Sequence, residues 1–132
     1  MNDRQRYDDF LKVMLELEQL SFAIYDAVKH QADGWRLRVV GLRRELGDRV
    51  GVAVTTLDDW TPSAPAVASL LPKLREEMAE LRTALAEHQA SWPAVSLDPS
   101  APGYRESLAK LMTAQTRVRA TMEHIDALLN AG

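Results

Sequence analysis

The chain has 132 residues, 46% of them hydrophobic and 27% charged, with 16 basic against 19 acidic residues and a formal net charge of -3. This length and composition predict one globular domain and exclude a disordered or collagen-like chain, while the small negative charge argues against a protein dedicated to duplex nucleic acid. The absence of cysteine excludes disulfides, thiolate metal sites and cysteine nucleophiles.

The first predicted element is a long helix over residues 4–31. Its apolar positions recur every three or four residues, which is the period of one helix face. They are Tyr7, Phe10, Met14, Leu17, Ile24 and Val28, with Ser21 as the polar member of the row. The helix is expected to end near Asp33 and Gly34, a pair that favours a turn.

The same helix carries a second apolar row on another face. Its members are Leu11, Leu15, Phe22 and Tyr25, and Glu18 interrupts it. One row is enough to hold a helix in a bundle, so the second predicts either a helix placed deep between its neighbours or a face that binds another chain. A homodimer is the simplest form of the second alternative, because it would bury the row on both copies.

The second predicted helix begins at Trp35. Its apolar row consists of Trp35, Val39, Leu42, Leu46, Val50, Val54 and Leu57. Its second half leaves two alternatives open. Gly47 allows a kink or a break, because glycine inside a helix costs about 1 kcal/mol relative to alanine, and the valines after it alternate as in a strand. A single strand without a partner leaves its hydrogen bonds unmade, so we expect a helix.

Two further helices are predicted after connections that contain proline. The third is expected to have Ser63 as its N-cap and Pro65 in its first turn, and the fourth to be capped by Ser100. Their apolar rows are Val67, Leu71, Leu74, Met78, Leu81 and Leu85 in the third helix, and Tyr104, Leu108, Leu111, Gln115, Val118, Met122, Ile125 and Leu129 in the fourth. The steps of four and three in the last row are typical of left-handed bundle packing.

Four long helices with short connections predict an all-α, antiparallel up-down-up-down four-helix bundle that forms a single domain over residues 1–132. In that topology, side chains that are far apart in the sequence gather at one end of the bundle. They are His30, Trp35, His88, Trp92 and Tyr104. Such an aromatic end is suited to holding a partner peptide or a small apolar ligand in a pH-dependent way. The alternative, which we favour, is that these side chains close the end of the hydrophobic core.

A basic segment opens the second predicted helix. The candidates for binding phosphate or an acidic partner are Arg36, Arg38, Arg43 and Arg44, followed by Arg49. These arginines spread over more than one helix face. The spacings Glu45–Arg49 and Arg44–Asp48 also favour ion pairs within the helix, so we expect a solvated surface with salt bridges rather than an anion site.

Five carboxylates form two short motifs: Glu76, Glu77 and Glu80 spell EExxE, and Glu123 and Asp126 spell ExxD. Together they are similar to the magnesium-binding signature of the all-α MazG-like nucleotide pyrophosphohydrolases. This resemblance implies metal-dependent hydrolysis with Glu77, Glu80, Glu123 and Asp126 as ligands. The two motifs are farther apart here than in that family, and Glu76, Glu80 and Glu123 fall on outward helical positions, whereas metal ligands in a bundle project inward.

The sequence contains no glycine-rich phosphate loop and no GxSxG motif, and we predict no catalytic residue, metal or cofactor. The favoured function is a non-enzymatic protein-interaction module, namely an adaptor, a small regulator or an export-chaperone-like bundle. It would bind another protein through the first helix or the aromatic end. The MazG-like hydrolase is the alternative. The N-terminal segment lacks the pattern of a secretory signal and no apolar run has the length of a membrane span, so we expect a cytoplasmic protein without a membrane partner.

Overall fold

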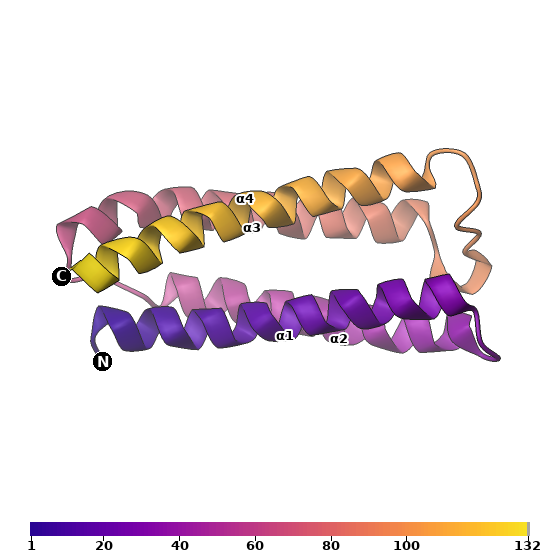
Figure 1. The fold of residues 1–132 in the computed structure, drawn as a ribbon, viewed down its shortest axis with the longest axis horizontal. Helices are drawn as coiled ribbons and strands as arrows, with labels where there is room; N and C mark the ends of the chain where they lie inside the picture. Colours follow the sequence, from indigo (N-terminus) through magenta and orange to yellow (C-terminus); the bar gives the residue numbers. More distant parts are fainter. Residues whose placement is uncertain (132) are drawn as a thin grey trace.

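The computed structural model describes residues 1–131, and within them the chain forms four long α-helices and one short 3-10 helix. In chain order they are α1 (Asp3–His30), α2 (Trp35–Asp58), α3 (Pro65–Ser91), η1 (Ala94–Ser96) and α4 (Tyr104–Ala131). The predicted all-α class with four long helices is therefore confirmed. Each long helix runs back along the one before it, so both termini lie at the same end (Figure 1). Across these residues, none of the helices combines the length and the apolar character that a membrane crossing requires.

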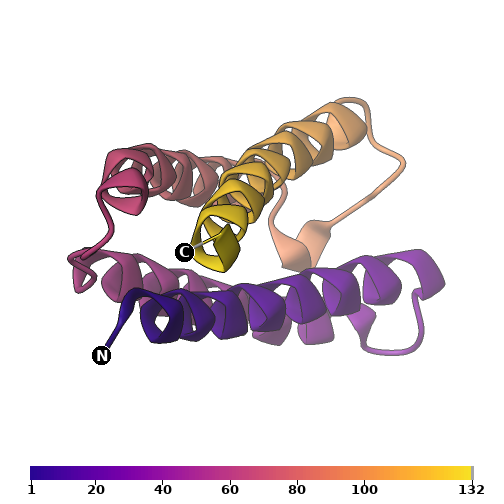
Figure 2. The ribbon, with the colours of Figure 1, turned by 60° about the vertical axis from the view of Figure 1, so that its left-hand side comes forward.

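The four helices form two pairs that face each other across a hydrophobic core. α1 packs along α2, and α3 packs along α4. Figure 2 shows the second pair crossing the first at an angle. All four helices contribute to the main core, which includes the fully buried side chains of Phe10, Leu57, Leu74, Met78 and Ile125. Burying one such side chain stabilises the fold by about 1.5 to 3 kcal/mol, so these predicted apolar rows supply much of the stability.

A second, smaller core lies at the end of the bundle where α1 turns into α2. Its buried members are Ala27, Val28, Trp35, Val39, Ala94, Leu97 and Tyr104. Ala94 and Leu97 belong to the connection between α3 and α4, residues 92–103, which we call the strap. Two arginines of α2 hold the strap: Arg36 donates from Nε and a terminal nitrogen to the carbonyl of Leu97, and Arg43 donates to the carbonyl of Trp92 over 2.5 Å. This connection is thus part of the core rather than a free loop.

The ends of α1 follow from local sequence. Asn2 and Gln5 form a reciprocal capping box at the start of the helix, in which each side chain bonds the backbone N–H of the other residue. After His30 the chain reverses through Gln31 at φ 48° and Gly34 at φ 75°. Only glycine adopts this left-handed region without steric cost, which agrees with the predicted turn at Asp33 and Gly34.

α2 is continuous from Trp35 to Asp58, so neither the break at Gly47 nor the strand over its second half is present. Gly47 lies on the exposed side of the helix. Leu46, Val50 and Ala53, which precede and follow it in the sequence, are buried on the side of α2 that faces the main core. Their burial offsets the cost of about 1 kcal/mol that glycine carries in a helix interior.

The predicted caps of the third and fourth helices are wrong. Pro65 lies in the first turn of α3 as predicted, but the N-cap is Ala64, which makes no side-chain capping hydrogen bond. The carboxylate of Asp3 accepts hydrogen bonds from the backbone N–H groups of Ser63 and Ala64 and from the indole of the buried Trp60. The carboxylate of Asp3 therefore holds the connection just before α3, and Ser63 does not cap the helix.

Ser100 is also not a cap. It lies in a turn before α4, where its backbone N–H and its hydroxyl both donate to the side chain of Asp98. α4 begins directly after Gly103. The φ of Gly103 is 90°, which lies in the left-handed region that only glycine adopts without steric cost. A serine that follows a proline is favoured both in turns and at helix N-caps, so the sequence alone does not distinguish the two positions for Ser100.

Replacing Asp3 by alanine should lower the free energy of unfolding by about 2 kcal/mol, because it leaves two backbone N–H groups and a buried indole without their acceptor. Burial raises the pKa of Asp3, but the amides of Ala64 and Ser63 and the Trp60 indole lower it more, so the pKa lies below its ordinary value. The stabilisation is therefore present at neutral pH and is lost as the pH falls through the depressed pKa. Urea unfolding at pH 7 and at pH 3 measures both effects. Asp9→Ala, an exposed position on the same helix, is the control and should change stability little at pH 7.

Candidate functional site

The structure brings four of the five predicted aromatic-end residues together. The Trp92 ring meets the Tyr104 ring edge-on, with centroids 5.4 Å apart, and the His88 ring lies 5.6 Å from Tyr104. Trp35 and Tyr104 belong to the second core, and Trp92 packs against it half-buried. These rings are packed against one another, so little of their surface is left to hold a ligand. The arrangement agrees with the favoured alternative, in which they close the end of the core.

His30 lies outside this group. Its ring is exposed at the end of α1, where Nδ1 lies 3.1 Å from the carboxylate of Asp26 and 3.0 Å from the Asp26 carbonyl. The predicted up-down arrangement indicated the end of the bundle at which α1 ends with His30. It could not indicate the direction of the side chain, because the last turn of a helix faces solvent on most sides.

His88 is the buried titratable group of the aromatic end. Its Nδ1 lies 2.7 Å from the hydroxyl of Ser107 on α4. Burial and, to a smaller extent, the nearby positive charge of Arg43 together lower the pKa of His88 from 6.5 to about 4. Burial also raises the pKa of Tyr104 above its ordinary value of 10.0, with Arg43 opposing part of that change. Both side chains are therefore neutral at physiological pH, as core side chains should be.

The arginines of α2 are divided between structural and exposed positions. Arg36 and Arg43 hold the strap, and the guanidinium of Arg36 also lies over the Trp35 ring, 4.6 Å from its centroid. Arg38 and Arg44 are exposed. The four candidates for anion binding thus do not converge on one point.

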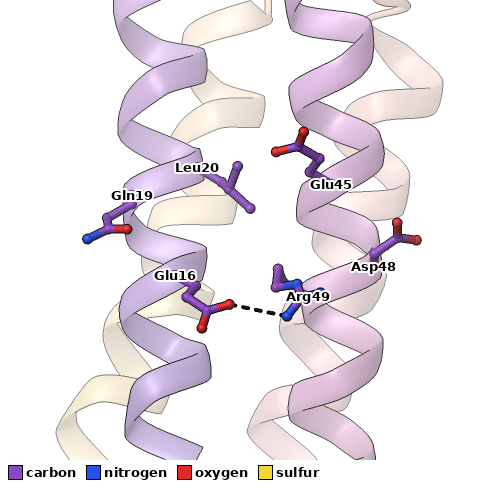
Figure 3. Close-up of a pocket in the computed structure, with 6 residues that line it drawn as sticks. All are labelled: Glu16, Gln19, Leu20, Glu45, Asp48 and Arg49. Atoms are coloured by element: carbon purple, nitrogen blue, oxygen red, sulfur yellow. Dashed lines mark hydrogen bonds and ion pairs between the residues drawn. The ribbon is translucent and has the colours of Figure 1, made fainter.

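The ion pairs predicted within α2 are replaced by one between helices. Arg49 pairs with Glu16 of α1 over 3.2 Å rather than with Glu45. Figure 3 shows this pair in an open pocket between α1 and α2, with Glu45 and Asp48 on the α2 side and Leu20 pointing between the helices. The pocket has a mixed lining of three carboxylates, one arginine, one glutamine and one leucine. Its charge is partly neutralised by the Glu16–Arg49 pair.

The carboxylates of the hydrolase alternative are not brought together. Glu80 pairs with Arg117 of α4, Asp126 pairs with Arg4 of α1 over 2.8 Å, and Glu123 is exposed. Within residues 1–131 no group of three or more histidine, aspartate and glutamate side chains is placed to hold a metal ion. The arrangement that the resemblance to MazG-like enzymes implies is therefore not found in this part of the chain.

Glu77 occupies a place that the sequence did not indicate. It is buried between α3 and α4 and accepts a hydrogen bond from the hydroxyl of the buried Thr121. Thr121 follows Ala114 by seven residues, and both are buried on the same side of α4. This seven-residue spacing is the feature of the sequence from which a second buried row on α4 could have been predicted. A buried carboxylate with a hydroxyl partner contributes specificity to the pairing of α3 and α4.

The second apolar row of α1 lies largely on the surface. Leu11 is partly buried against the main core, whereas Leu15, Phe22 and Tyr25 are exposed, Phe22 to 69%. The row thus does not lie deep between neighbours, which was one of the two predicted alternatives. We call the exposed side chains of Leu15, Phe22 and Tyr25 the outer α1 face.

The exposure of Tyr25 has a structural cause. It follows Tyr7 by 18 residues, five turns of helix, and therefore lies on the same side of α1 about 27 Å away. Tyr7 is 3% exposed and donates a hydrogen bond to the carbonyl of Met122 on α4, whereas Tyr25 is 55% exposed. Both views show α4 diverging from α1 toward the end of α1 (Figures 1 and 2). Along this side, Arg119 of α4 pairs with Glu18, one heptad before Tyr25.

α4 also exposes an apolar side chain where it leaves α1. Met112 is exposed, and it precedes Arg119 by seven residues, so it lies on the side of α4 that faces α1. The Arg4–Asp126 and Glu18–Arg119 pairs hold the two helices together along the first half of α1. Beyond them, Phe22 and Tyr25 of α1 and Met112 of α4 are exposed. Comparison with protein families, characterised proteins and solved structures finds no match to this chain.

Proposed function

We propose that this protein is a non-enzymatic interaction module, an adaptor, small regulator or export-chaperone-like bundle, that binds another protein through the outer α1 face. The observation that carries the proposal is the exposure of Leu15, Phe22 and Tyr25, which follow one another at intervals of seven and three residues along one helix. Burying Tyr25 inside the same molecule would require α4 to lie closer, and α4 diverges from α1 (Figure 1). Contiguous exposed apolar side chains on a soluble domain mark interaction sites.

The aromatic end supports the proposal less well than the outer α1 face. Its rings already have partners within the chain, and the strap covers them. Aromatic side chains that contribute most to a protein interface must be free before binding and desolvated after it. Phe22 and Tyr25 meet the first condition, and Trp35 and Tyr104 do not.

Replacing Phe22 by serine should abolish capture of the partner while leaving the fold unchanged, because the side chain contributes nothing to the core. The measurement is affinity capture from native lysate with the wild-type and Phe22→Ser chains as bait, followed by quantitative mass spectrometry. Loss of a central aromatic contact lowers affinity by about 2 kcal/mol or more, so a true partner should be depleted at least tenfold.

The matched control is Leu37→Ser, which changes an equally exposed apolar side chain on α2. It should capture the same proteins as the wild-type chain. A partner retained by Phe22→Ser, or lost equally with Leu37→Ser, would place the binding surface elsewhere or identify nonspecific adhesion.

A further inference from the structure

A regular row of exposed residues runs the length of α1 and includes two members of the outer α1 face. Its positions are separated by steps of four and three residues, the spacing of a coiled-coil seam. The row is Asp8, Lys12, Leu15, Gln19, Phe22, Asp26 and Lys29. All seven side chains are exposed. We call this row the outer stripe, and it lies on the side of α1 away from the main core.

The outer stripe is complementary to itself when it is read in the opposite direction. The residues on either side of Gln19 are Leu15 and Phe22, which are both apolar. Farther out, Lys12 on one side corresponds to Asp26 on the other, and Asp8 corresponds to Lys29. Each basic position thus has an acidic counterpart at the same number of stripe positions from Gln19.

We propose that a second copy of this chain covers the outer stripe, with the two α1 helices antiparallel and the twofold axis near Gln19. This inference rests on the proposed function, for which it names the partner. In that register, Leu15 of each copy lies against Phe22 of the other. Lys12 faces Asp26 of the second copy, and Asp8 faces Lys29. A twofold axis makes every one of these contacts twice.

Other arrangements of the same stripe are less complementary. In a parallel pair each residue faces its own counterpart, which places Lys12 against Lys12 and Asp26 against Asp26. Moving the antiparallel pair by one layer places Asp8 against Asp26, or Lys12 against Lys29, and puts Leu15 or Phe22 against Gln19. Like charges that face each other across a helix pair are unfavourable, so the register centred on Gln19 is selected.

The charged members of the stripe are available for these contacts. Asp8 and Asp26 make only local, exposed pairs with Arg4 and His30 one turn away. Within residues 1–131, neither Lys12 nor Lys29 forms a salt bridge. Exposed pairs of this kind contribute little affinity, so the charges set the direction and register, and the Leu15 and Phe22 contacts supply the attraction.

The first test is the mass in solution. Light scattering of the wild-type chain at increasing concentration should approach twice the monomer mass of 14.8 kDa. Phe22→Asp should weaken the dimer at least a hundredfold, and Leu37→Asp should leave it unchanged. Lys29→Asp should weaken it about tenfold, and the same change combined with Asp8→Lys should restore it, because both partners of each pair are then exchanged. Circular dichroism confirms that each variant is folded.

The second test uses the absence of cysteine in the chain. A single Gln19→Cys variant should form a disulfide-linked dimer under mild oxidation, because the two copies meet at this position. A single Lys29→Cys variant should not do so alone, but should cross-link when mixed with Asp8→Cys. A parallel pair would instead cross-link Lys29→Cys to itself, which would overturn the proposed orientation.

The outcomes separate this inference from the proposed function. A wild-type chain that stays monomeric at millimolar concentration would overturn the self-association but not the binding of a different protein, which the Phe22→Ser capture experiment measures independently. A dimer that is insensitive to Phe22→Asp would overturn the inference and show that the copies meet elsewhere. If neither the capture of a partner by Phe22→Ser nor the mass of Phe22→Asp in solution differed from that of the wild-type chain, the outer α1 face would be excluded as an interaction site.

Discussion

Acidification from pH 6.5 to pH 4 should destabilise the protein by up to about 3 kcal/mol through His88 alone. The unfolded chain takes up a proton on this histidine as the pH falls below 6.5, whereas in the folded state burial and Arg43 keep its pKa at about 4. Over this window the unfolded state binds more protons than the folded state, so the stability that is fully present above pH 6.5 is progressively lost. Chemical denaturation at half-unit pH steps measures the slope.

The variant that isolates this effect is His88→Gln, which cannot be protonated but retains a hydrogen-bonding group opposite the hydroxyl of Ser107. Its free energy of unfolding should vary much less between pH 6.5 and pH 4 than that of the wild-type chain. His30→Gln is the matched control, since His30 is exposed on α1, and it should leave the wild-type slope in place. A slope that survives His88→Gln would mean that another group carries the pH dependence.

Replacing Leu97 by alanine should lower the free energy of unfolding by about 3 kcal/mol, although the residue belongs to a connection between helices. Leu97 is 1% exposed and packs in the second core with residues of α1, α2 and α4. Truncating a fully buried leucine removes its transfer free energy and leaves a cavity, which together cost about 2 to 5 kcal/mol. Thermal and urea unfolding measure the change.

Val95→Ala is the comparison within the same strap. Val95 is 70% exposed in η1, two positions from Leu97, and its truncation should change stability by less than about 0.5 kcal/mol. Equal effects of the two substitutions would show that the strap does not take part in the core. The contrast therefore tests whether the aromatic end is a closed part of the hydrophobic core.

The closure of this end decides how the function should be sought. If the strap is held as the structure has it, Trp35 and Tyr104 are unavailable to a partner, and the outer α1 face is the surface that remains. Stability measurements on Leu97 and binding measurements on Phe22 thus address the two predicted alternatives separately. A protein with its aromatic end closed and its α1 face exposed would interact along its length rather than at its tip.

The sequence by itself was sufficient to predict the four long helices and the face of each helix that is buried. The predicted rows that contain Phe10, Leu46, Leu74 and Val118 form the buried or partly buried faces of the four helices, because burial of one face per helix is a property of spacing alone. The start of α3 at Pro65 and the turn at Gly34 were also predictable. Both depend on the conformational limits of single residues.

Only the tertiary structure decided features that depend on which surfaces meet. Asp3 holds the connection before α3, Arg49 pairs with Glu16 rather than with Glu45, and Glu77 is buried against Thr121, because each of these contacts joins segments that are distant in the sequence. The second row of α1 had the same pattern as a core row. Tyr25 is exposed because α4 diverges from α1, at a crossing angle that is set by the packing of all four helices and that no local sequence pattern encodes.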